Sequence, residues 1–421
     1  MLKVQKRGLH PMIIIGALFF IFGFVTWVNS VLIPYLQIAC VLNNFQSYLV
    51  AFAFYISYFV MASPSGLVLK KTGYRKGISL GLLFVAVGAF VFIPAALYRI
   101  YFIFLIGLFI QGAGLALLQT AANPYVTILG PIESGAKRMS IMGICNGIAG
   151  IIAPAVLGIL ILKNTNEITA QIADMDVFDK AKALDQLAHK IITPYIVIGL
   201  ILVLSALWIW RSGLPEMAEP PEDGVDISLK TAKASILQFP HLLIGIVVLF
   251  LYVGVEAIAG NTVIQYGTSQ GIPMSVSKFF TSYVLTGMLI GYLVGILCIP
   301  KYFSQRLALI VSSGFGIVCV IGALFTQGVT SVLFVIFLGL ANSLMYPSIW
   351  PLAIDGLGRF TKIGSSLLVM AICGGALLPL AYGWLADRFN TQQAYWIVIP
   401  CYLVIGYYAV SGYRVGRKLI K

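Results

Sequence analysis

The sequence predicts an all-α membrane protein in which twelve transmembrane helices form two pseudo-symmetric bundles of six. Three observations support this fold class. The chain has 421 residues, of which 60% are hydrophobic and only 10% are charged, too little polar surface for a protein surrounded by water. Apolar runs of roughly 20 residues, the length that crosses the hydrocarbon core of a bilayer, recur along the chain. One long polar segment then divides these runs into two equal groups.

The predicted spans follow one another in order, mostly with short connections. Their approximate bounds are 11–38, 44–68, 77–98, 101–128, 138–163, 191–211, 240–267, 274–299, 305–327, 329–354, 362–385 and 392–413. Residues 212–238, rich in proline and glutamate, form the predicted cytoplasmic linker, which separates an N-terminal bundle at 1–211 from a C-terminal bundle at 239–421. We expect an amphipathic periplasmic helix within residues 164–190, because apolar residues recur there at helical spacing: Ile172, Val177, Ala181, Leu184 and Leu187.

The basic residues are distributed unevenly between the predicted loops. The chain carries 27 Lys and Arg against 14 Asp and Glu, a net charge of +13. Most basic residues fall on the side of the termini and the linker, so the positive-inside rule predicts that this side is cytoplasmic. An even number of spans also requires both termini on one side. Topology and anionic lipid explain the positive charge, and we expect no nucleic-acid partner.

Two stretches carry a resemblance to a known family. SGLVLKKTGYRKG, after the second span, resembles the helix 2–3 motif of the major facilitator superfamily. The residues that match the motif are Gly66, Lys71, Gly73, Arg75 and Lys76. Lys70 stands where the motif has aspartate. Residues 119–127, followed by Leu-Gly-Pro at 129–131, resemble the helix-four signature of the fucose–proton symporter family, closest to its glucose/galactose and N-acetylglucosamine permeases. Residues 19–36 and 251–260 resemble that family's first and seventh helices.

The resemblance implies a fold of two rocking bundles, a sugar substrate, and a gating role for Gly73 and Arg75. The fucose symporters carry carboxylates on helices one and four, but the matching positions here are Ser30 and Gln119, which are uncharged. Fucose is therefore a poor candidate, and a hexose of the glucose/galactose type is favoured, with a permease for N-acetylglucosamine or another hexose derivative as the alternative. The sugar-contacting asparagine of the family's helix five matches Asn146.

Polar residues interrupt several of the predicted spans. Gln119 and Asn123 are four residues apart, hence on one face of a helix. Pro124 cannot donate a backbone hydrogen bond, so it frees a carbonyl beside them, and with Gly130 it forms a predicted hinge. A buried amide without a partner costs about 1–3 kcal/mol, so we expect these groups to line an aqueous path that binds sugar hydroxyls. The other candidates are Asn29, Ser30, Asn146, Asn261, Gln265 and Asn342. The alternative for each is a hydrogen bond that only fixes helix packing.

Trp27 and Trp350 lie beside these polar positions, and each could cover the apolar face of a sugar ring. The alternative is an anchor at the membrane interface. Glu256 is the acidic residue well inside a predicted span. A carboxylate at mid-membrane costs about 2.5–3.5 kcal/mol on insertion scales, which indicates a function. It could take up a proton, bind beside a sodium ion, or bond the sugar directly.

Together these features predict a monomeric secondary active hexose importer of a bacterial inner membrane that works by alternating access. A coupled proton or sodium ion is expected, and no cofactor or metal. An uncoupled uniporter is a further alternative. A membrane enzyme is not indicated, since paired carboxylates, a histidine cluster and a nucleophile motif are lacking in the sequence. A channel is not indicated either, because a repeated filter sequence is lacking.

Overall fold

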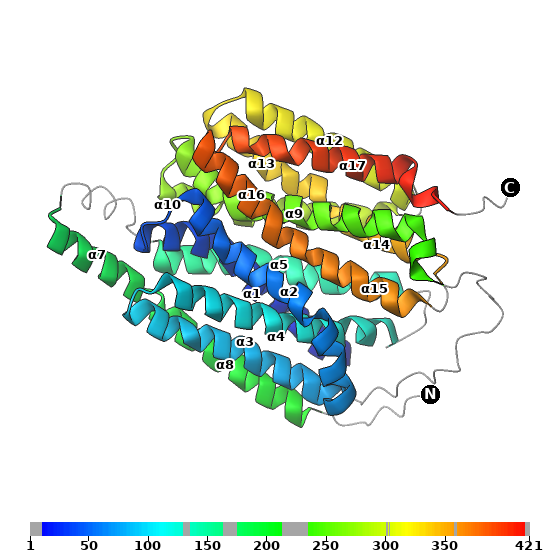
Figure 1. The fold of residues 1–421 in the computed structure, drawn as a ribbon, viewed down its shortest axis with the longest axis horizontal. Helices are drawn as coiled ribbons and strands as arrows, with labels where there is room; N and C mark the ends of the chain where they lie inside the picture. Colours follow the sequence, from blue (N-terminus) through cyan, green and yellow to red (C-terminus); the bar gives the residue numbers. More distant parts are fainter. Residues whose placement is uncertain are drawn as a thin grey trace.

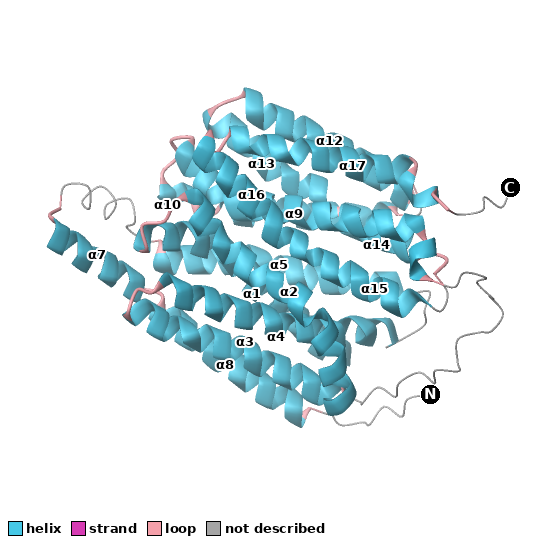
Figure 2. Ribbon diagram, viewed as in Figure 1, coloured by secondary structure: helices cyan, strands magenta, loops and turns pink. Residues whose placement is uncertain are grey.

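The computed structural model describes residues 11–128, 135–162, 175–212, 235–299, 302, 304–357 and 360–416. Every element within these ranges is helical (Figure 2). Twelve of the helical segments found there are long and apolar enough to cross a membrane. The prediction of an all-α, twelve-span membrane protein is therefore confirmed.

In the described residues, the N-terminal bundle contains six long helices and one short surface helix. In chain order they are α1 (Pro11–Ala39), α2 (Asn44–Thr72), α3 (Tyr74–Leu97), α4 (Tyr101–Ile128), α5 (Gly135–Ile161), the surface helix α7 (Val177–His189) and α8 (Ile192–Arg211). Proline lies inside several of these helices, for example Pro34 in α1 and Pro154 in α5. Membrane helices tolerate such prolines because neighbouring groups satisfy the freed backbone carbonyls.

Among the described residues, the C-terminal bundle and the end of the linker before it contain a larger number of shorter elements. They are η2 (Ile236–Gln238), α9 (Pro240–Ser269), α10 (Met274–Ser277), α11 (Phe280–Cys298), α12 (Gln305–Phe325), α13 (Gly328–Ser343), α14 (Met345–Ile354), α15 (Thr361–Met370), η4 (Ala371–Cys373), α16 (Gly374–Arg388), η5 (Gln393–Ile397), α17 (Val398–Val410) and η6 (Gly412–Arg414). The tenth span is broken at Leu344, between α13 and α14. The eleventh changes to a 3-10 turn at η4, between α15 and α16.

The two ends of the molecule carry different elements. We call the end where α1 begins and α17 ends the terminal face, and the opposite end, which carries the projecting helix α7, the α7 face (Figure 1). The two bundles lie side by side with their long helices running between these faces (Figure 1). Contact between the bundles is made mainly by α1 with α9, α2 with α16, and α5 with α11.

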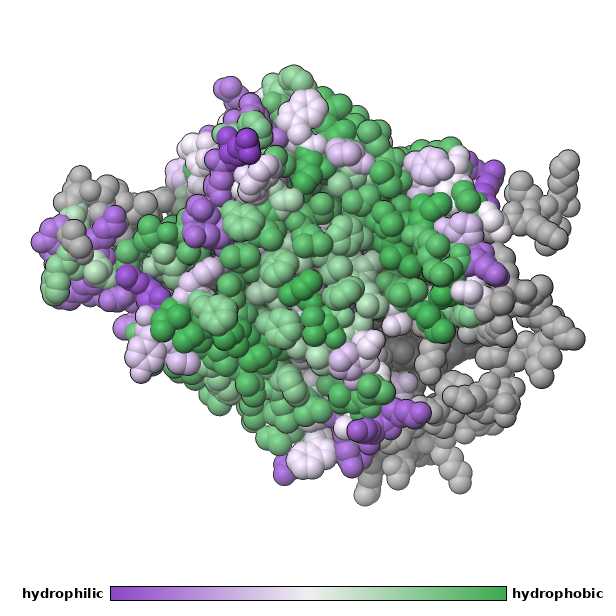
Figure 3. Space-filling view, viewed as in Figure 1, coloured by the Kyte–Doolittle hydropathy of each residue, from purple (hydrophilic) through white to green (hydrophobic). Residues whose placement is uncertain are grey.

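A broad apolar belt surrounds the molecule between the two faces. Large hydrophobic side chains are exposed along it, among them Val87, Leu204 and Val311. Polar residues gather at the two ends of the view (Figure 3). An apolar surface this extensive is far larger than a water-soluble monomer exposes, and it is typical of a protein that spans a membrane.

Close helix packing in the interior depends on glycine at particular places. A methyl group added at Gly112 of α4 would collide with the backbone of α2 at Phe54, and one at Gly374 would collide with α9 at Phe250. Membrane helices approach closely where the residues at their contact are small. These contacts fix α2 against α4, and the start of α16 against α9.

Helix α7 lies in the segment for which an amphipathic helix is expected. Its residues Leu184 and Leu187 are buried against the bundle, whereas the residues on the opposite side of the helix are exposed. Asp176 caps its first turn by accepting a hydrogen bond of 2.8 Å from the backbone of Asp179. Helix formation thus explains the placement of this acidic residue.

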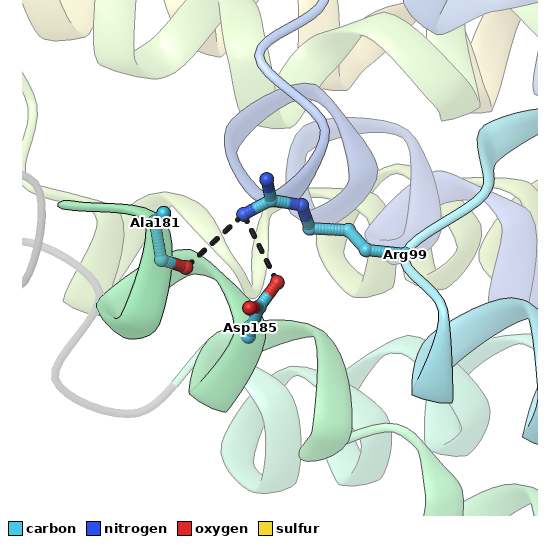
Figure 4. Close-up of polar contacts among 3 residues, drawn as sticks. All are labelled: Arg99, Ala181 and Asp185. Atoms are coloured by element: carbon cyan, nitrogen blue, oxygen red, sulfur yellow. Dashed lines mark hydrogen bonds and ion pairs between the residues drawn. The ribbon is translucent and has the colours of Figure 1, made fainter. Parts of the chain in front are cut away.

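Arg99, in the turn between α3 and α4, holds α7 against the N-terminal bundle. Its guanidinium lies 3.2 Å from the carboxylate of Asp185 and donates a hydrogen bond of 3.3 Å to the carbonyl of Ala181 (Figure 4). Tyr35 of α1 adds a hydrogen bond to the carbonyl of Ala188 at 3.1 Å. These contacts all lie within the N-terminal bundle.

Candidate functional site

Glu256 lies in the middle of α9, between the two bundles. Protein atoms enclose it on all sides, yet its side chain keeps some accessible surface, as expected for a residue that lines an internal space. The hydroxyl of Tyr252, one turn away on the same helix, donates a hydrogen bond to its carboxyl group. Tyr292 of α11 and Tyr346 of α14 are close enough to interact with it electrostatically.

One tyrosine of the N-terminal bundle also reaches Glu256. Tyr55 of α2 is buried and interacts electrostatically with the carboxyl group. Its ring packs across the interface on the C-terminal bundle, where a methyl group at Gly375 would come within 3.0 Å of it. Because Tyr55 and Glu256 belong to different bundles, this electrostatic interaction depends on how the bundles are arranged.

Gln119 joins the same cluster through a second tyrosine. Its side-chain Nε2 donates a hydrogen bond of 3.1 Å to the hydroxyl of Tyr58, which also hydrogen-bonds Thr26 of α1. The rings of Tyr58 and Tyr55 are stacked, with centroids 6.3 Å apart and planes at 29°. A continuous row of side chains therefore runs from Gln119 in one bundle to Glu256 in the other.

Both predicted tryptophans contact this cluster. The ring of Trp350, which is half-buried, stacks on Tyr346 with centroids 5.6 Å apart. Trp27 is buried between the bundles, where it packs with Leu285 and Met288 against Tyr292. Trp27 is thus buried in the protein interior, and Trp350 is half-buried beside Tyr346.

Other predicted polar residues lie in closely packed surroundings. Ser30 donates a hydrogen bond of 2.7 Å to the carbonyl of Trp27 in its own helix. Asn29 and Asn261 are both buried, and the Nδ2 of Asn29 and both amide atoms of Asn261 have no hydrogen-bond partner among the described residues. Such unsatisfied amides are the kind of group that a bound polar molecule or water can pair with.

The amides of Asn146 and Asn342 make contacts between helices. Asn146, half-buried on α5, donates a hydrogen bond of 3.3 Å to the carbonyl of Phe19. Asn342 accepts one of 2.8 Å from Tyr402 of α17, and Tyr402 in turn lies within electrostatic range of Glu256. Both asparagines thus support helix packing near the site.

Gln265 lies further toward the α7 face than the other candidates. Its Nε2 donates to the side chain of Gln37 and, at 3.3 Å, to the hydroxyl of Ser47. Both partners belong to the N-terminal bundle, so Gln265 joins the two bundles at this end. In this structure Gln265 therefore makes a contact between the two bundles.

The predicted gating residues and the sugar-binding candidate Asn123 are described only in part. Asn123 and Pro124 lie within α4, but their side chains are outside the described part of the chain, as is the whole of Gly130. Gly73, between α2 and α3, has a φ of 76°, a left-handed conformation that favours glycine. Arg75 donates a hydrogen bond of 3.3 Å to the carbonyl of Ser212, the residue that follows α8.

The tyrosines around Glu256 were not predicted from the sequence. The available signals were weak: Tyr252 is four residues before Glu256, and Tyr55 and Tyr58 are three residues apart in mid-span. Such spacing places two residues on one helix face, but it does not say which other helix that face meets. Across the part of the chain that is described, no three His, Cys, Asp or Glu residues cluster as metal ligands would.

Two helical bundles that enclose a polar, acid-containing centre define a membrane transport protein. This chain belongs to the major facilitator superfamily, whose family profile matches residues 15–371. The predicted family is thereby confirmed.

Two relatives cover nearly all of the chain. The glucose/galactose transporter of Brucella abortus biovar 1 (strain 9-941) is 34% identical over 414 residues, or 97% of this chain and 95% of the relative. The L-fucose-proton symporter of Escherichia coli (strain K12) is 33% identical over 418 residues, or 96% and 94%. The crystal structure of FucP in the outward conformation has a TM-score of 0.71 at 30% identity, and the match covers 95% of this chain and 98% of that chain.

Proposed function

We propose that this protein is a secondary active transporter that imports a hexose of the glucose/galactose type by alternating access. The observation that carries the proposal is the row of side chains from Gln119 to Glu256, which joins an uncharged polar group in one bundle to one acid in the other. Relatives named as a glucose/galactose transporter and an L-fucose-proton symporter support a sugar substrate.

The chemistry of the cluster suits a neutral sugar. Amides and tyrosine hydroxyls can each donate or accept a hydrogen bond, as sugar hydroxyls do, and they carry no charge that must be neutralised. We assign hydrogen bonding to Gln119, Asn146 and the unsatisfied amides of Asn29 and Asn261. Trp350 offers a half-buried ring to cover the apolar side of the sugar. The uncharged positions Ser30 and Gln119 favour glucose or galactose over fucose.

Glu256 is the proposed coupling residue. An ionised carboxylate enclosed between the bundles is unfavourable, whereas a bound proton or an adjacent sodium ion neutralises it. The neutral, loaded site can then be closed on both sides while the bundles rock. Tyr55 interacts electrostatically with Glu256 from the other bundle, so loading of this acid changes an interaction between the bundles.

We further propose that the terminal face is cytoplasmic, as the positive-inside rule predicts, in a protein of a bacterial inner membrane that works as a monomer surrounded by lipid. Pro124 and Gly130 are proposed to let the end of α4 bend, with Gly73 and Arg75 guiding the neighbouring turn. Pro124→Ala should slow turnover more than it weakens sugar binding, and equal effects would argue against a hinge. The alternatives are transport of N-acetylglucosamine, or an uncoupled uniporter.

Uptake into proteoliposomes tests the proposal. Purified protein would be given a panel of labelled hexoses, including fucose and N-acetylglucosamine, first with a pH gradient alone and then with a sodium gradient alone. Concentrative uptake of glucose or galactose with one gradient is expected. Equilibration with neither gradient effective would indicate a uniporter, and the absence of any sugar flux would contradict the proposal.

A further inference from the structure

Asp387, near the end of α16, forms a direct connection between the two bundles at the α7 face. One carboxylate oxygen accepts hydrogen bonds from the backbone of Asn44 at 2.9 Å and from its side-chain amide at 2.8 Å. The other oxygen accepts one of 2.7 Å from the backbone of Phe45. A single acid of the C-terminal bundle thus binds three donors of the N-terminal bundle.

The three donors belong to the beginning of helix α2. Asn44 and Phe45 are its first two residues, and the first N–H groups of a helix have no acceptor within the helix. The helix's own cap, Asn43, accepts from the backbone of Gln46 at 2.8 Å and therefore leaves the earlier two groups free. A carboxylate at this point is also favoured by the positive end of the helix dipole. Asp387 completes the capping of α2 from the opposite bundle.

Amide side chains extend the same contact toward the centre of the protein. Gln37 of α1 donates a hydrogen bond of 3.2 Å to the side chain of Asn44, and Gln265 of α9 donates to Gln37. Tyr48 of α2 packs edge-on against Tyr382 of α16, with ring centroids 5.6 Å apart. We call Asp387, Asn44, Phe45, Gln37 and Gln265 the α7-face latch.

We propose that Asp387 is a gating residue whose carboxylate holds the bundles together at the α7 face by capping α2, so that opening of this face requires release of that cap. Asp387 is exposed, which allows water to replace the three hydrogen bonds when the bundles separate. The latch is therefore strong enough to favour the closed face and weak enough to open in every transport cycle. The inference concerns the arrangement of the bundles and does not depend on the identity of the sugar.

The test measures distances between spin labels on the full-length protein in lipid nanodiscs, with the six native cysteines replaced by alanine. One label pair, at Tyr98 and Thr330, spans the bundles at the α7 face, and a second, at Lys71 and Ser411, spans them at the terminal face. All four positions are exposed and outside the latch. Asp387→Ala should shift the ratio of open to closed α7 face by roughly ten-fold, the size expected for loss of a helix cap. The two distances should change in opposite directions, since the bundles rock.

Matched variants separate a gating role from a general loss of structure. Asp387→Asn keeps one acceptor oxygen but loses the charge, so its shift should be smaller than that of Asp387→Ala. Asp185→Asn removes an acid at the same face whose described contact lies within one bundle, and it should leave both distances unchanged. Unchanged distances in both Asp387 variants, or an equal change in Asp185→Asn, would overturn the proposal.

Discussion

The two ends of the interface between the bundles differ in how they are held. At the α7 face, hydrogen bonds cross directly from one bundle to the other: Asp387 to α2, Gln265 to α1, and Ser282 to the carbonyl of Ile151 at 2.7 Å. Helix α9 is enclosed on every side there, and all its residues from Ala257 to Gly267 are buried. The α7 face is closed in this structure.

Toward the terminal face, α14 and α4 pack within their own bundles, whereas α15 packs on α2 of the other bundle. Helix α14 lies against α9 and α12, and α4 lies against α2 and α3. Side chains that face the centre are only half-buried here, including Gln119, Tyr346 and Trp350. Direct hydrogen bonds between the bundles are thus described at the α7 face, whereas these three side chains toward the terminal face keep some accessible surface.

The largest effect on transport is expected from substitution of Glu256, which lies between these two regions. Glu256→Gln should abolish uphill accumulation of sugar, because the variant can neither take up a proton nor neutralise a cation, while exchange of sugar across the membrane survives. Uptake and counterflow in proteoliposomes would be compared with Asp179→Asn, which removes one acid outside the spans. A variant that still concentrates sugar fully would show that Glu256 is not the coupling site.

A methyl group added at Gly383 should hinder closure of the α7 face. In Gly383→Ala the new carbon would lie 3.0 Å from the carbonyl oxygen of Asn44 and closer still to the ring of Tyr48. Overpacking of this kind costs about 1–3 kcal/mol, so turnover should fall roughly ten-fold. Gly314→Ala, with no heavy atom within 4 Å of the added carbon, is the control and should transport normally. Equal rates for the two variants would mean that this face does not need close packing.

A smaller effect on transport should follow from loss of the hydrogen bond between Gln119 and Tyr58. Tyr58→Phe removes the acceptor of the Gln119 amide, and one hydrogen bond contributes about 1 kcal/mol, so the KM for sugar should rise roughly five-fold. Tyr195→Phe is a matched control in the same bundle, because that buried hydroxyl has no hydrogen-bond partner among the described residues. If both variants change KM alike, the row does not position the sugar.

The smallest effect is expected at the attachment of α7. The pair between Arg99 and Asp185 is partly exposed, at 29% and 54% of the two side chains, and such pairs contribute about 0–1 kcal/mol. Asp185→Asn should therefore speed hydrogen exchange within α7 without changing the transport rate. A marked loss of transport would show that α7 takes part in gating.

Much of the fold could be predicted because the bilayer imposes simple requirements. A span must be apolar over a fixed length, so twelve runs of hydrophobic residues were enough to find the helices. Glu256 could also be singled out, since a carboxylate inside a span is unfavourable unless it has a use. The sequence did not distinguish Gln265 from Gln119, because both are amides within apolar runs, although one lies at the contact between bundles and the other beside the central cluster.

The sequence alone determined the number of spans, the division into two bundles, the family and the acid at mid-membrane, because each follows from the order of residues along one helix or one loop. Only the tertiary structure decided that four tyrosines from α2, α9, α11 and α14 surround that acid, and that Asp387 caps a helix 343 residues away in sequence. Helical periodicity fixes which residues share a face of one helix. It does not fix which face of another helix they meet, and that depends on the packing of the whole bundle.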